Sequence, residues 1–557
     1  QAEMLVEMGR YRQALAPAQQ ATRIAPMHAY SWAKLGQVYR YVDRYEAALE
    51  AYERALALKP DYAWAVNGKG IVLERLGRYD EALAMYRRAS EIAPDDVWHW
   101  YNQGNLLVLQ ERYAEAIPLL ERAIQVNPDH ARSWARLGST YRHMDEPGKA
   151  LSFLSRALKL DSSYAWAWNE RGVALEILTR YDEAVEAYGR AALAEPENPL
   201  YWYNKGDTLV FLKQHEAALD ALQRALESDP RYVRAWAKQA QVLRRIGRYE
   251  EALASYSRAV ELSPEYAWAW NGRGLALSVL GRHDEALSCF RQAAALQPDD
   301  LWFWYNQADE LIVMHRYEDA LAPLERALRL DRGHAESWAK RGQALRRLGR
   351  YKESVAAYDQ ALKLEPHYAW AWNGRGLALE AMDRREEALL SYERAVQEDP
   401  SSVWYWINQI EPLLALGRRE DALDAIDEAI KLSPENESAW ARKGQILRRL
   451  DRHQDALVAY DQALQLAPHY GWAWNGKGLA YAALERWESA LECYIQATHA
   501  APRDVWFWHN RGEALMQLSR WEEAVSIFSK ALEIDSSHRP SWEKRTEARK
   551  KLNQDGD

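Results

Sequence analysis

The 557-residue chain has only two cysteines, Cys289 and Cys493, and no apolar run long enough to cross a bilayer. The cysteines occupy the same position of a repeat and stand 204 residues apart. A disulfide between them is therefore not expected, and both are predicted to be small buried side chains. The first residues lack the pattern of a signal peptide, so we expect a cytoplasmic protein with reduced thiols.

The excess of negative over positive charge is small, and catalytic motifs are scarce. The net charge is −9, which provides no general attraction to nucleic acid or to anionic membranes. The 14 histidines show no metal-ligand spacing, and neither a phosphate-binding loop nor a nucleophile elbow is found. Most carboxylates stand in "DEA" or "EEA" at predicted helix starts, where they favour the helix dipole. We therefore expect no enzyme activity, no cofactor and no metal.

Phenylalanine is rare, whereas tryptophan and tyrosine are abundant: the counts are 6, 26 and 32. No Gly/Ser-rich or Pro-rich linker divides the chain, and self-similarity runs through almost all of it. With position 1 set at Ala29, each unit begins 34 residues after the last. Fifteen complete units cover residues 29–538 without insertion or deletion.

A few positions of the unit hardly vary. Position 4 is Trp in fourteen units, position 8 is Gly in twelve, position 27 is always Ala, and position 32 is Pro in twelve. Apolar residues at helical spacing predict one helix over positions 1–14 and a second over 18–31. Proline at position 32 ends the second helix, and the small residues let the two helices approach closely.

The pattern "W..LG" at 32–36, followed by Ala48, Tyr52, Ala55 and Pro60, resembles the tetratricopeptide repeat. The resemblance covers nearly the whole chain. It implies an all-α, right-handed α-solenoid of helix hairpins. It also implies that the first helix of each hairpin lines a concave face that binds peptides or proteins.

The two ends depart from complete units. Residues 1–28 form a partial repeat, because Gln1 falls at position 7, and Gly9, Ala14 and Pro26 at positions 15, 20 and 32. The chain would thus begin inside a first helix, and we expect further residues before Gln1. Residues 539–557 are predicted to form a capping helix over 539–552 and a frayed tail.

The units come in three kinds that rotate strictly, so that five blocks of 102 residues repeat. The first kind reads "ESWAKRGQALRRLGR" (336–350), the second "AWAWNGRGLAL" (369–379) and the third "LWFWYNQADEL" (301–311). Tandem duplication alone would produce this period, and so would selection for a repeated function. The sequence leaves both explanations open.

Units of the second and third kind carry an additional tryptophan at position 2. Residues two apart on an α-helix differ by roughly 200° in direction. Trp268 must therefore point away from Trp270, which holds the nearly invariant position 4. The other tryptophans at position 2 are Trp64, Trp98, Trp166, Trp302, Trp370, Trp404, Trp472 and Trp506.

The family resemblance implies that positions 2, 5, 6, 9, 12 and 13 face the groove. Asparagine there can pair with a peptide backbone, tryptophan and tyrosine add contact area, and arginine can bind carboxylates. The candidate ligand-binding residues are Trp166, Asn169, Tyr203, Asn204, Arg244, Trp268, Asn271, Trp302, Tyr305, Asn306, Asp309, Arg346, Trp370, Asn373, Trp404, Asn408 and Arg448.

Structural explanations for the same residues stay open. The additional tryptophans could fill space between adjacent first helices. The asparagines could bridge neighbouring helices by bonding to nearby groups. The arginines at position 12 could pair with Glu74, Glu176 and Glu380 at position 12 of the following unit.

These observations favour a non-enzymatic scaffold that binds a protein or an extended peptide in its groove. A first alternative makes the array the C-terminal sensor arm of a larger regulatory protein whose effector lies upstream. A second, single-stranded RNA binding through stacked aromatics and arginine, is disfavoured by the acidic balance. No membrane partner is expected.

Overall fold

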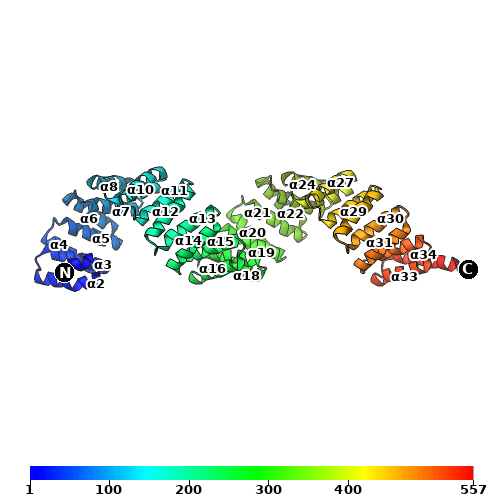
Figure 1. Ribbon diagram of the computed structural model, residues 1–557, viewed down its shortest axis with the longest axis horizontal. Helices are drawn as coiled ribbons and strands as arrows, with labels where there is room; N and C mark the ends of the chain where they lie inside the picture. Colours follow the sequence, from blue (N-terminus) through cyan, green and yellow to red (C-terminus); the bar gives the residue numbers. More distant parts are fainter. Residues whose placement is uncertain (556–557) are drawn as a thin grey trace. The chain divides into compact units, whose positions relative to one another are not determined.

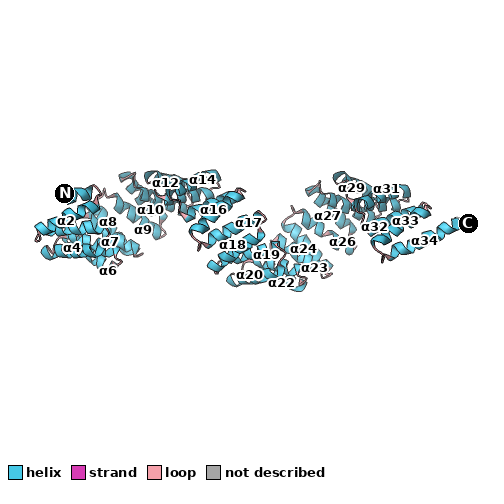
Figure 2. Ribbon diagram, turned by 90° about the horizontal axis from the view of Figure 1, so that it is seen from below, coloured by secondary structure: helices cyan, strands magenta, loops and turns pink. Residues whose placement is uncertain are grey.

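The computed structural model describes residues 1–555, and within them every regular element is an α-helix (Figure 2). The predicted all-α architecture of helix-turn-helix repeats is thereby confirmed. The helices form two compact units, Gln1–Gly281 and Arg282–Asp557.

The unit Gln1–Gly281 begins with helices in the partial repeat and continues with hairpins of nearly constant length. Its helices are α1 (Ala2–Glu7), α2 (Tyr11–Ile24), α3 (Ala29–Tyr41), α4 (Tyr45–Leu58), α5 (Ala63–Arg75), α6 (Tyr79–Ile92), α7 (Val97–Leu109), α8 (Tyr113–Val126), α9 (Ala131–His143), α10 (Pro147–Leu160), α11 (Ala165–Ile177), α12 (Tyr181–Ala194), α13 (Pro199–Phe211), α14 (His215–Ser228), α15 (Val233–Arg245), α16 (Tyr249–Leu262) and α17 (Ala267–Val279).

The unit Arg282–Asp557 repeats the same plan. Its helices are α18 (His283–Leu296), α19 (Leu301–Val313), α20 (Tyr317–Leu330), α21 (Ala335–Arg347), α22 (Tyr351–Leu364), α23 (Ala369–Glu380), α24 (Arg385–Glu398), α25 (Val403–Asn408), α26 (Ile410–Ala415), α27 (Arg419–Leu432), α28 (Glu437–Arg449), α29 (His453–Leu466), α30 (Gly471–Ala483), α31 (Trp487–Ala500), α32 (Val505–Gln517), α33 (Trp521–Ile534) and α34 (Arg539–Asp555).

The helices follow the 34-residue register with small shifts. The first helix of a hairpin, called helix A here, covers positions 1–13, as in α3; the second, helix B, covers positions 17–30, as in α4. Each helix packs against the next one in the chain, and successive helices A also touch one another. In the first unit of Figure 1, α4, α6 and α8 follow the outer edge of an arc, and α5 and α7 lie inside it. Helices A thus share one face.

Glycines let a buried tyrosine of helix B fit between hairpins. Tyr358, at position 24 of its unit, is 1% exposed. A Cβ placed on Gly342 of its own hairpin would lie 2.9 Å from the tyrosine ring, and one on Gly374 of the next hairpin 2.4 Å from Cζ. Both glycines are therefore required by close approach rather than by backbone torsion.

The turn within every hairpin has one residue with a left-handed backbone. At position 15 this residue is Gly in some hairpins, as in Gly247 with φ 82°, and a non-glycine in others, as in Thr179 with φ 58°. The left-handed region costs a β-branched residue about 1–2 kcal/mol. The turn therefore has the same shape throughout, although glycine is not always present to relax it.

One helix A departs from the predicted continuous helix. In the unit that begins at Val403, helix A is split into α25 and α26 at Gln409. Pro412 explains the break, because it has no N–H for the carbonyl of Asn408 and its ring would clash with that carbonyl. This unit also has Ile410 where most units have the glycine of position 8.

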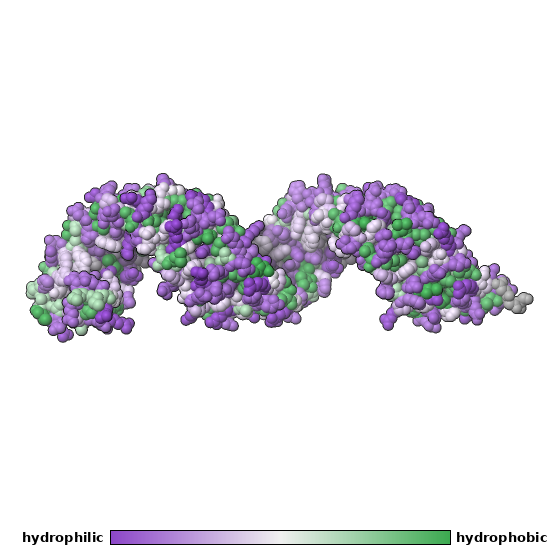
Figure 3. All heavy atoms as spheres, in the orientation of Figure 1, coloured by the Kyte–Doolittle hydropathy of each residue, from purple (hydrophilic) through white to green (hydrophobic). Residues whose placement is uncertain are grey.

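The last helix is longer than predicted. Helix α34 extends to Asp555, so the residues 553–555 that were assigned to a frayed tail are helical, and Gly556 and Asp557 lie outside the described residues. Among residues 1–555, no helix is long and apolar enough to cross a membrane. The cysteines are buried as predicted, each 4% exposed. The visible surface is largely polar with hydrophobic residues scattered between (Figure 3).

Candidate functional site

The tryptophan at position 4 ties its hairpin to the loop before it in all units except the one that has Val66. Its indole N–H donates to the backbone carbonyl of position 32 in the preceding unit, at 2.8 Å for Trp100 to Pro94 and 2.9 Å for Trp508 to Pro502. The same bond recurs at Trp32, Trp134, Trp168, Trp202, Trp236, Trp270, Trp304, Trp338, Trp372, Trp406, Trp440 and Trp474. This tryptophan therefore has a structural role.

The second tryptophan lies on a different surface. Positions 2, 5, 6 and 9 of helices A form this surface, which is called the A face below. In units of the third kind, Trp98, Trp302, Trp404 and Trp506 are 41, 54, 67 and 53% exposed. In units of the second kind, Trp64, Trp166, Trp268 and Trp370 are half-buried, and Trp472 is 37% exposed. The additional tryptophans are thus not sealed between hairpins, and those of the third kind are the most accessible.

A cation of the preceding helix A covers the half-buried tryptophans. The charged group of Lys34 lies 5.2 Å from the Trp64 ring centroid, and that of Arg136 4.5 Å from the Trp166 centroid. Lys238 stands 5.8 Å from Trp268, and Lys340 5.5 Å from Trp370. Cation–π attraction of this kind contributes about 0.5–2 kcal/mol. These tryptophans therefore have part of their ring surface occupied by the chain itself.

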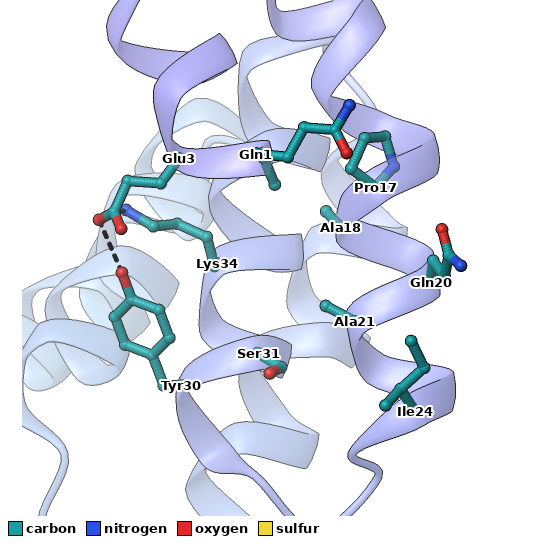
Figure 4. Close-up of a pocket in the computed structure, with 11 residues that line it drawn as sticks. Gln1, Glu3, Pro17, Ala18, Gln20, Ala21, Ile24, Tyr30, Ser31 and Lys34 are labelled. Carbon is teal, nitrogen blue, oxygen red and sulfur yellow. Dashed lines mark hydrogen bonds and ion pairs between the residues drawn. The ribbon is translucent and has the colours of Figure 1, made fainter.

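Carboxylates at position 9 pair with most of the cations at position 6 of the following helix A. Lys238 pairs with Asp207 at 2.7 Å, Arg442 pairs with Glu411 at 3.1 Å, and Lys340 pairs with Asp309. Figure 4 shows the first member of the series: Glu3 accepts the Tyr30 hydroxyl at 2.7 Å and lies 3.0 Å from Lys34 Nζ. Both donors lower the pKa of Glu3, Tyr30 first. Lys34, Lys238, Lys340 and Arg442 are therefore neutralised in place.

The predicted asparagines form pairs along the A face. The Asn204 side-chain N–H donates to Asn169 Oδ1 at 2.8 Å, and Asn408 donates to Asn373 Oδ1 at 2.7 Å. Equivalent bonds join Asn102 to Asn67 and Asn510 to Asn475. Each bond connects neighbouring helices A, as the structural alternative predicted. It uses one acceptor and one donor of the pair, so the pair keeps hydrogen-bonding capacity for a guest.

The predicted arginines lie beside buried tyrosines of their own hairpins. Burial raises the pKa of Tyr358 to about 12, and the Arg346 guanidinium opposes that rise. Arg448 stands in the same way beside Tyr460, and Arg244 beside Tyr256.

The carboxylates that the alternative assigned to these arginines have other partners. Glu74, Glu176 and Glu380 accept hydroxyls from Tyr86, Tyr188 and Tyr392 at 2.6, 2.9 and 2.7 Å. The arginines and glutamates at position 12 therefore contribute to the packing of each hairpin.

The remaining candidates differ in access. Tyr203 is 6% exposed, with Arg234 5.0 Å from its ring centroid, so little of it remains for a guest. Tyr305 and Asn306 of the second unit are half-buried beside the exposed Trp302, and Asn271 of the first unit is half-buried. Among the described residues, no group of three or more His, Cys, Asp or Glu could hold a metal ion.

Comparison with models of protein families identifies the repeat. One model described as "Tetratricopeptide repeat" matches residues 148–199, 169–233, 203–267, 237–301, 305–362, 411–470 and 475–538. Others match 27–95, 95–163, 342–383 and 371–402. The chain belongs to the tetratricopeptide repeat family. Repeats of this family are typical of protein-interaction scaffolds.

Solved tetratricopeptide structures are similar over long stretches at low identity. YrrB, described as a TPR protein with an unusual peptide-binding site, is 29% identical over 33% of this chain and 96% of its own, with TM-score 0.30. The Cut9–Hcn1 assembly of APC/C is 15% identical over 93% of this chain and 96% of its own, with TM-score 0.35. Yeast Tom70 is 18% identical over 72% of this chain and 96% of its own, with TM-score 0.34. These TM-scores are too low to bear on function. No curated protein matches the chain.

Sequence reasoning missed a histidine that ends the loop before three tetratricopeptide units of the first kind and before the last helix, α34. His28, His130, His334 and His538 occupy position 34, and a serine follows three residues later. In each case the ring Nδ1 lies 2.7–2.9 Å from that serine Oγ. The recurring spacing His-x-x-Ser was the available signal. Three of these histidines also contact a position-2 tryptophan of the preceding helix A, and His28 contacts Tyr30.

Proposed function

We propose that this chain is a non-enzymatic scaffold that binds an extended segment of a partner protein along the A face. The observation that carries the proposal is the set of exposed tryptophans in third-kind units. Trp404 is the most exposed of them, at 67%, and the other three stand at multiples of 102 residues from it. Large aromatic side chains held on rigid helices are favourable anchors for a protein partner, since little entropy is lost on binding.

The amide pairs support an extended guest. Asn373 and Asn408 lie on the helices A that also carry Trp370 and Trp404. A primary amide can donate to and accept from a peptide backbone at once, whatever the guest's sequence. The array would therefore combine sequence-independent backbone contacts with aromatic anchors.

The charges of the A face favour a protein over a nucleic acid. A nucleic acid gains affinity mainly when free cations replace its counterions. Here Lys238, Lys340 and Arg442 are already paired with carboxylates of the same face. A guest phosphate would meet those carboxylates as well as the cations.

The proposal is tested by selecting binders from a library of random peptides of about ten residues, displayed without bias, against the full chain. Selected peptides are titrated into the chain, into Trp404→Ala, and into Asn373→Ala with Asn408→Ala. We expect each variant to weaken binding by about 10-fold or more, because it removes an anchor or a backbone contact. Leu390→Ala is the matched control, since Leu390 is exposed on helix B (α24).

Equal affinity of all four proteins, at unchanged helical content by circular dichroism, would contradict binding at the A face. If no peptide of the library binds the full chain, the proposal as a whole is contradicted.

A further inference from the structure

The aromatic rings of Trp302, Tyr305 and His334 meet at nearly right angles. The ring centroids of Trp302 and Tyr305 are 5.9 Å apart, those of Trp302 and His334 5.1 Å, and those of Tyr305 and His334 5.4 Å. The three interplanar angles are 81°, 87° and 81°. Tyr305 and His334 are half-buried, whereas Trp302 is 54% exposed. The cluster is thus an open corner with aromatic walls.

The corner is held rigidly by helix ends. Trp302 is in the first turn of α19, where its backbone N–H donates to Asp300 Oδ1 at 2.8 Å. His334 caps α21, and its Nδ1 accepts the Ser337 backbone N–H at 3.2 Å. The Nδ1 atom is therefore the acceptor. Rings fixed in this way lose little entropy when a guest binds.

The first unit contains the same corner with a cation inside it. The centroids of Trp98 and Tyr101 are 5.8 Å apart, and His130 lies 4.8 Å from Trp98 and 5.4 Å from Tyr101. These distances are within 0.3 Å of the corresponding ones at Trp302. There the guanidinium of Arg132 lies over Trp98, 5.6 Å from the ring centroid. The chain itself shows which group this geometry accepts.

The position of Arg132 is taken by Glu336 at the second corner. Arg132 and Glu336 both occupy position 2 of the helix A that follows the corner. Among the described residues, no lysine or arginine lies over the Trp302 ring, and Trp302 is more exposed than Trp98, at 54% against 41%. The Glu336 carboxylate, 44% exposed, lies 3.3 Å from His334 Nε2 without hydrogen-bond geometry. A carboxylate therefore stands where the first corner has its own cation.

The other blocks lack this combination. The equivalent residues are Trp404, Ile407, Asn436 and Ser438 in the fourth block, and Trp506, His509, His538 and Pro540 in the fifth. Neither set has a carboxylate at the position of Glu336. The second block has Leu200 in place of the tryptophan.

We propose that the corner formed by Trp302, Tyr305, His334 and Glu336 binds an arginine side chain of the partner protein. The inference rests on the proposed function, and it adds that the scaffold would recognise an arginine in its partner. The guanidinium would lie over the Trp302 ring, as Arg132 lies over Trp98, while Glu336 pairs with its charge. Both attractions require the cation, so a neutral side chain of the same shape would not replace it.

The test uses the full chain and capped amino acids in place of an unidentified partner. Binding of Nα-acetyl-arginine methylamide is followed by saturation-transfer NMR and by competition. The same measurement is made with the neutral isostere, Nα-acetyl-citrulline methylamide. We expect the arginine signal to exceed the citrulline signal at least about 5-fold in the unmodified chain. Glu336→Arg should remove the difference, because the chain would then fill its own corner.

Two further variants separate the corner from general surface binding. Trp302→Ala should also abolish the arginine preference, and Arg132→Glu should increase the arginine signal by opening the corner in the first unit. Val458→Ala, an exposed residue on helix B (α29), serves as the unchanged control. Circular dichroism checks the folding of each variant, and Glu336→Gln offers a milder change of charge.

Equal signals for arginine and citrulline, or an arginine preference that survives in both Glu336→Arg and Glu336→Gln, would overturn the inference. A stronger response to Nα-acetyl-trimethyllysine methylamide than to arginine would overturn the assignment of a guanidinium. The selected peptides could still bind the A face in these cases, so failure here is distinct from failure of the scaffold proposal.

Discussion

At the scale of single residues, the tyrosine at position 24 of first-kind units determines what the next hairpin can place at position 6. Tyr358 leaves no room for a Cβ at Gly374, as shown by the 2.4 Å distance. In the unit that begins at Ala131, position 24 is Leu154, and the residue equivalent to Gly374 is Glu170. Glu170 is 7% exposed and pairs with Arg142 at 3.0 Å. The smaller Leu154 at position 24 thus accompanies the larger Glu170 at position 6 of the next hairpin.

This dependence predicts the outcome of a double-mutant cycle. Gly374→Ala should lower the free energy of unfolding by about 1–3 kcal/mol, because the buried ring cannot move aside. Tyr358→Leu should lower it by a similar amount through lost packing. The double variant should cost at least about 1 kcal/mol less than the sum, since leucine leaves space and alanine favours the helix. Denaturant unfolding of the four proteins measures the coupling.

Gly148→Ala is the control for this cycle, because nothing lies within 4 Å of a Cβ there. It should be neutral or slightly stabilising. Strict additivity of Gly374→Ala and Tyr358→Leu would show that the two residues do not compete for one space.

At the scale of elements, the junction of α32 and α34 contains a histidine that must stay neutral. Burial, followed by the charges of His538 and Lys544, lowers the pKa of His509 from 6.5 to about 4. His509 is 6% exposed, and its Nδ1 lies 3.0 Å from Ser541 Oγ of α34. Protonation of His509 therefore opposes the docking of the last helix.

The sign of the pH effect follows from this lowered pKa. Between about pH 6.5 and 4 the unfolded histidine binds a proton that the folded one excludes, so the C-terminal hairpins lose stability as the pH falls through this window. The loss should be on the order of 3 kcal/mol when complete. Hydrogen exchange of α32–α34, compared near pH 7 and about pH 5 after correction for intrinsic rates, measures it.

His509→Tyr is the matched variant, since third-kind units have tyrosine at this position in Tyr101, Tyr203 and Tyr305. The variant should show a smaller loss of protection on acidification. The same loss in both proteins would assign the effect to other groups.

At the scale of the whole molecule, equivalent tryptophans return after every third hairpin. Within the second unit, Trp302, Trp404 and Trp506 are 102 residues apart. Successive helices A pack at a spacing of about 10 Å, so equivalent tryptophans stand on the order of 30 Å apart. An extended guest needs about nine residues to cover that distance.

This spacing predicts a step in affinity with guest length. A selected peptide of about ten residues is long enough to reach a second tryptophan, so truncation below about nine residues should lower its affinity by about 10-fold or more, because the second contact is intramolecular. Fluorescence anisotropy with a truncation series measures the step. Trp506→Ala should remove it for peptides that reach from Trp404 to Trp506. A smooth gain per added residue, without a step, would contradict two-point attachment.

The sequence was sufficient to predict the hairpins and their register. Trp at position 4, Gly at 8, Ala at 27 and Pro at 32 report close helix packing and helix ends, which depend on local geometry. The break at Pro412 was visible as a proline inside a predicted helix, yet the repeating pattern outweighed it.

The candidate site was predicted only in part, because its contacts join residues about one unit apart. Trp370 and Trp404 both stand at position 2, but only Trp370 is covered by a cation from the preceding helix A. The preceding helix presents Lys340 to Trp370, whereas position 6 before Trp404 is Gly374, which has no side chain. The exposure of a tryptophan therefore depends on position 6 of the preceding unit, and the 34-residue pattern alone does not show that these two positions meet.

The break between α25 and α26 has a consequence for how the array opens. In stacked repeats each hairpin is stabilised mainly by its nearest neighbours, so a weakened hairpin lowers the cooperativity between the segments on either side. The interrupted helix at Pro412 lies between continuous hairpins of the second unit. Transient unfolding would therefore begin there first, and a protease would find its earliest cleavage sites in that hairpin while the flanking repeats stay folded.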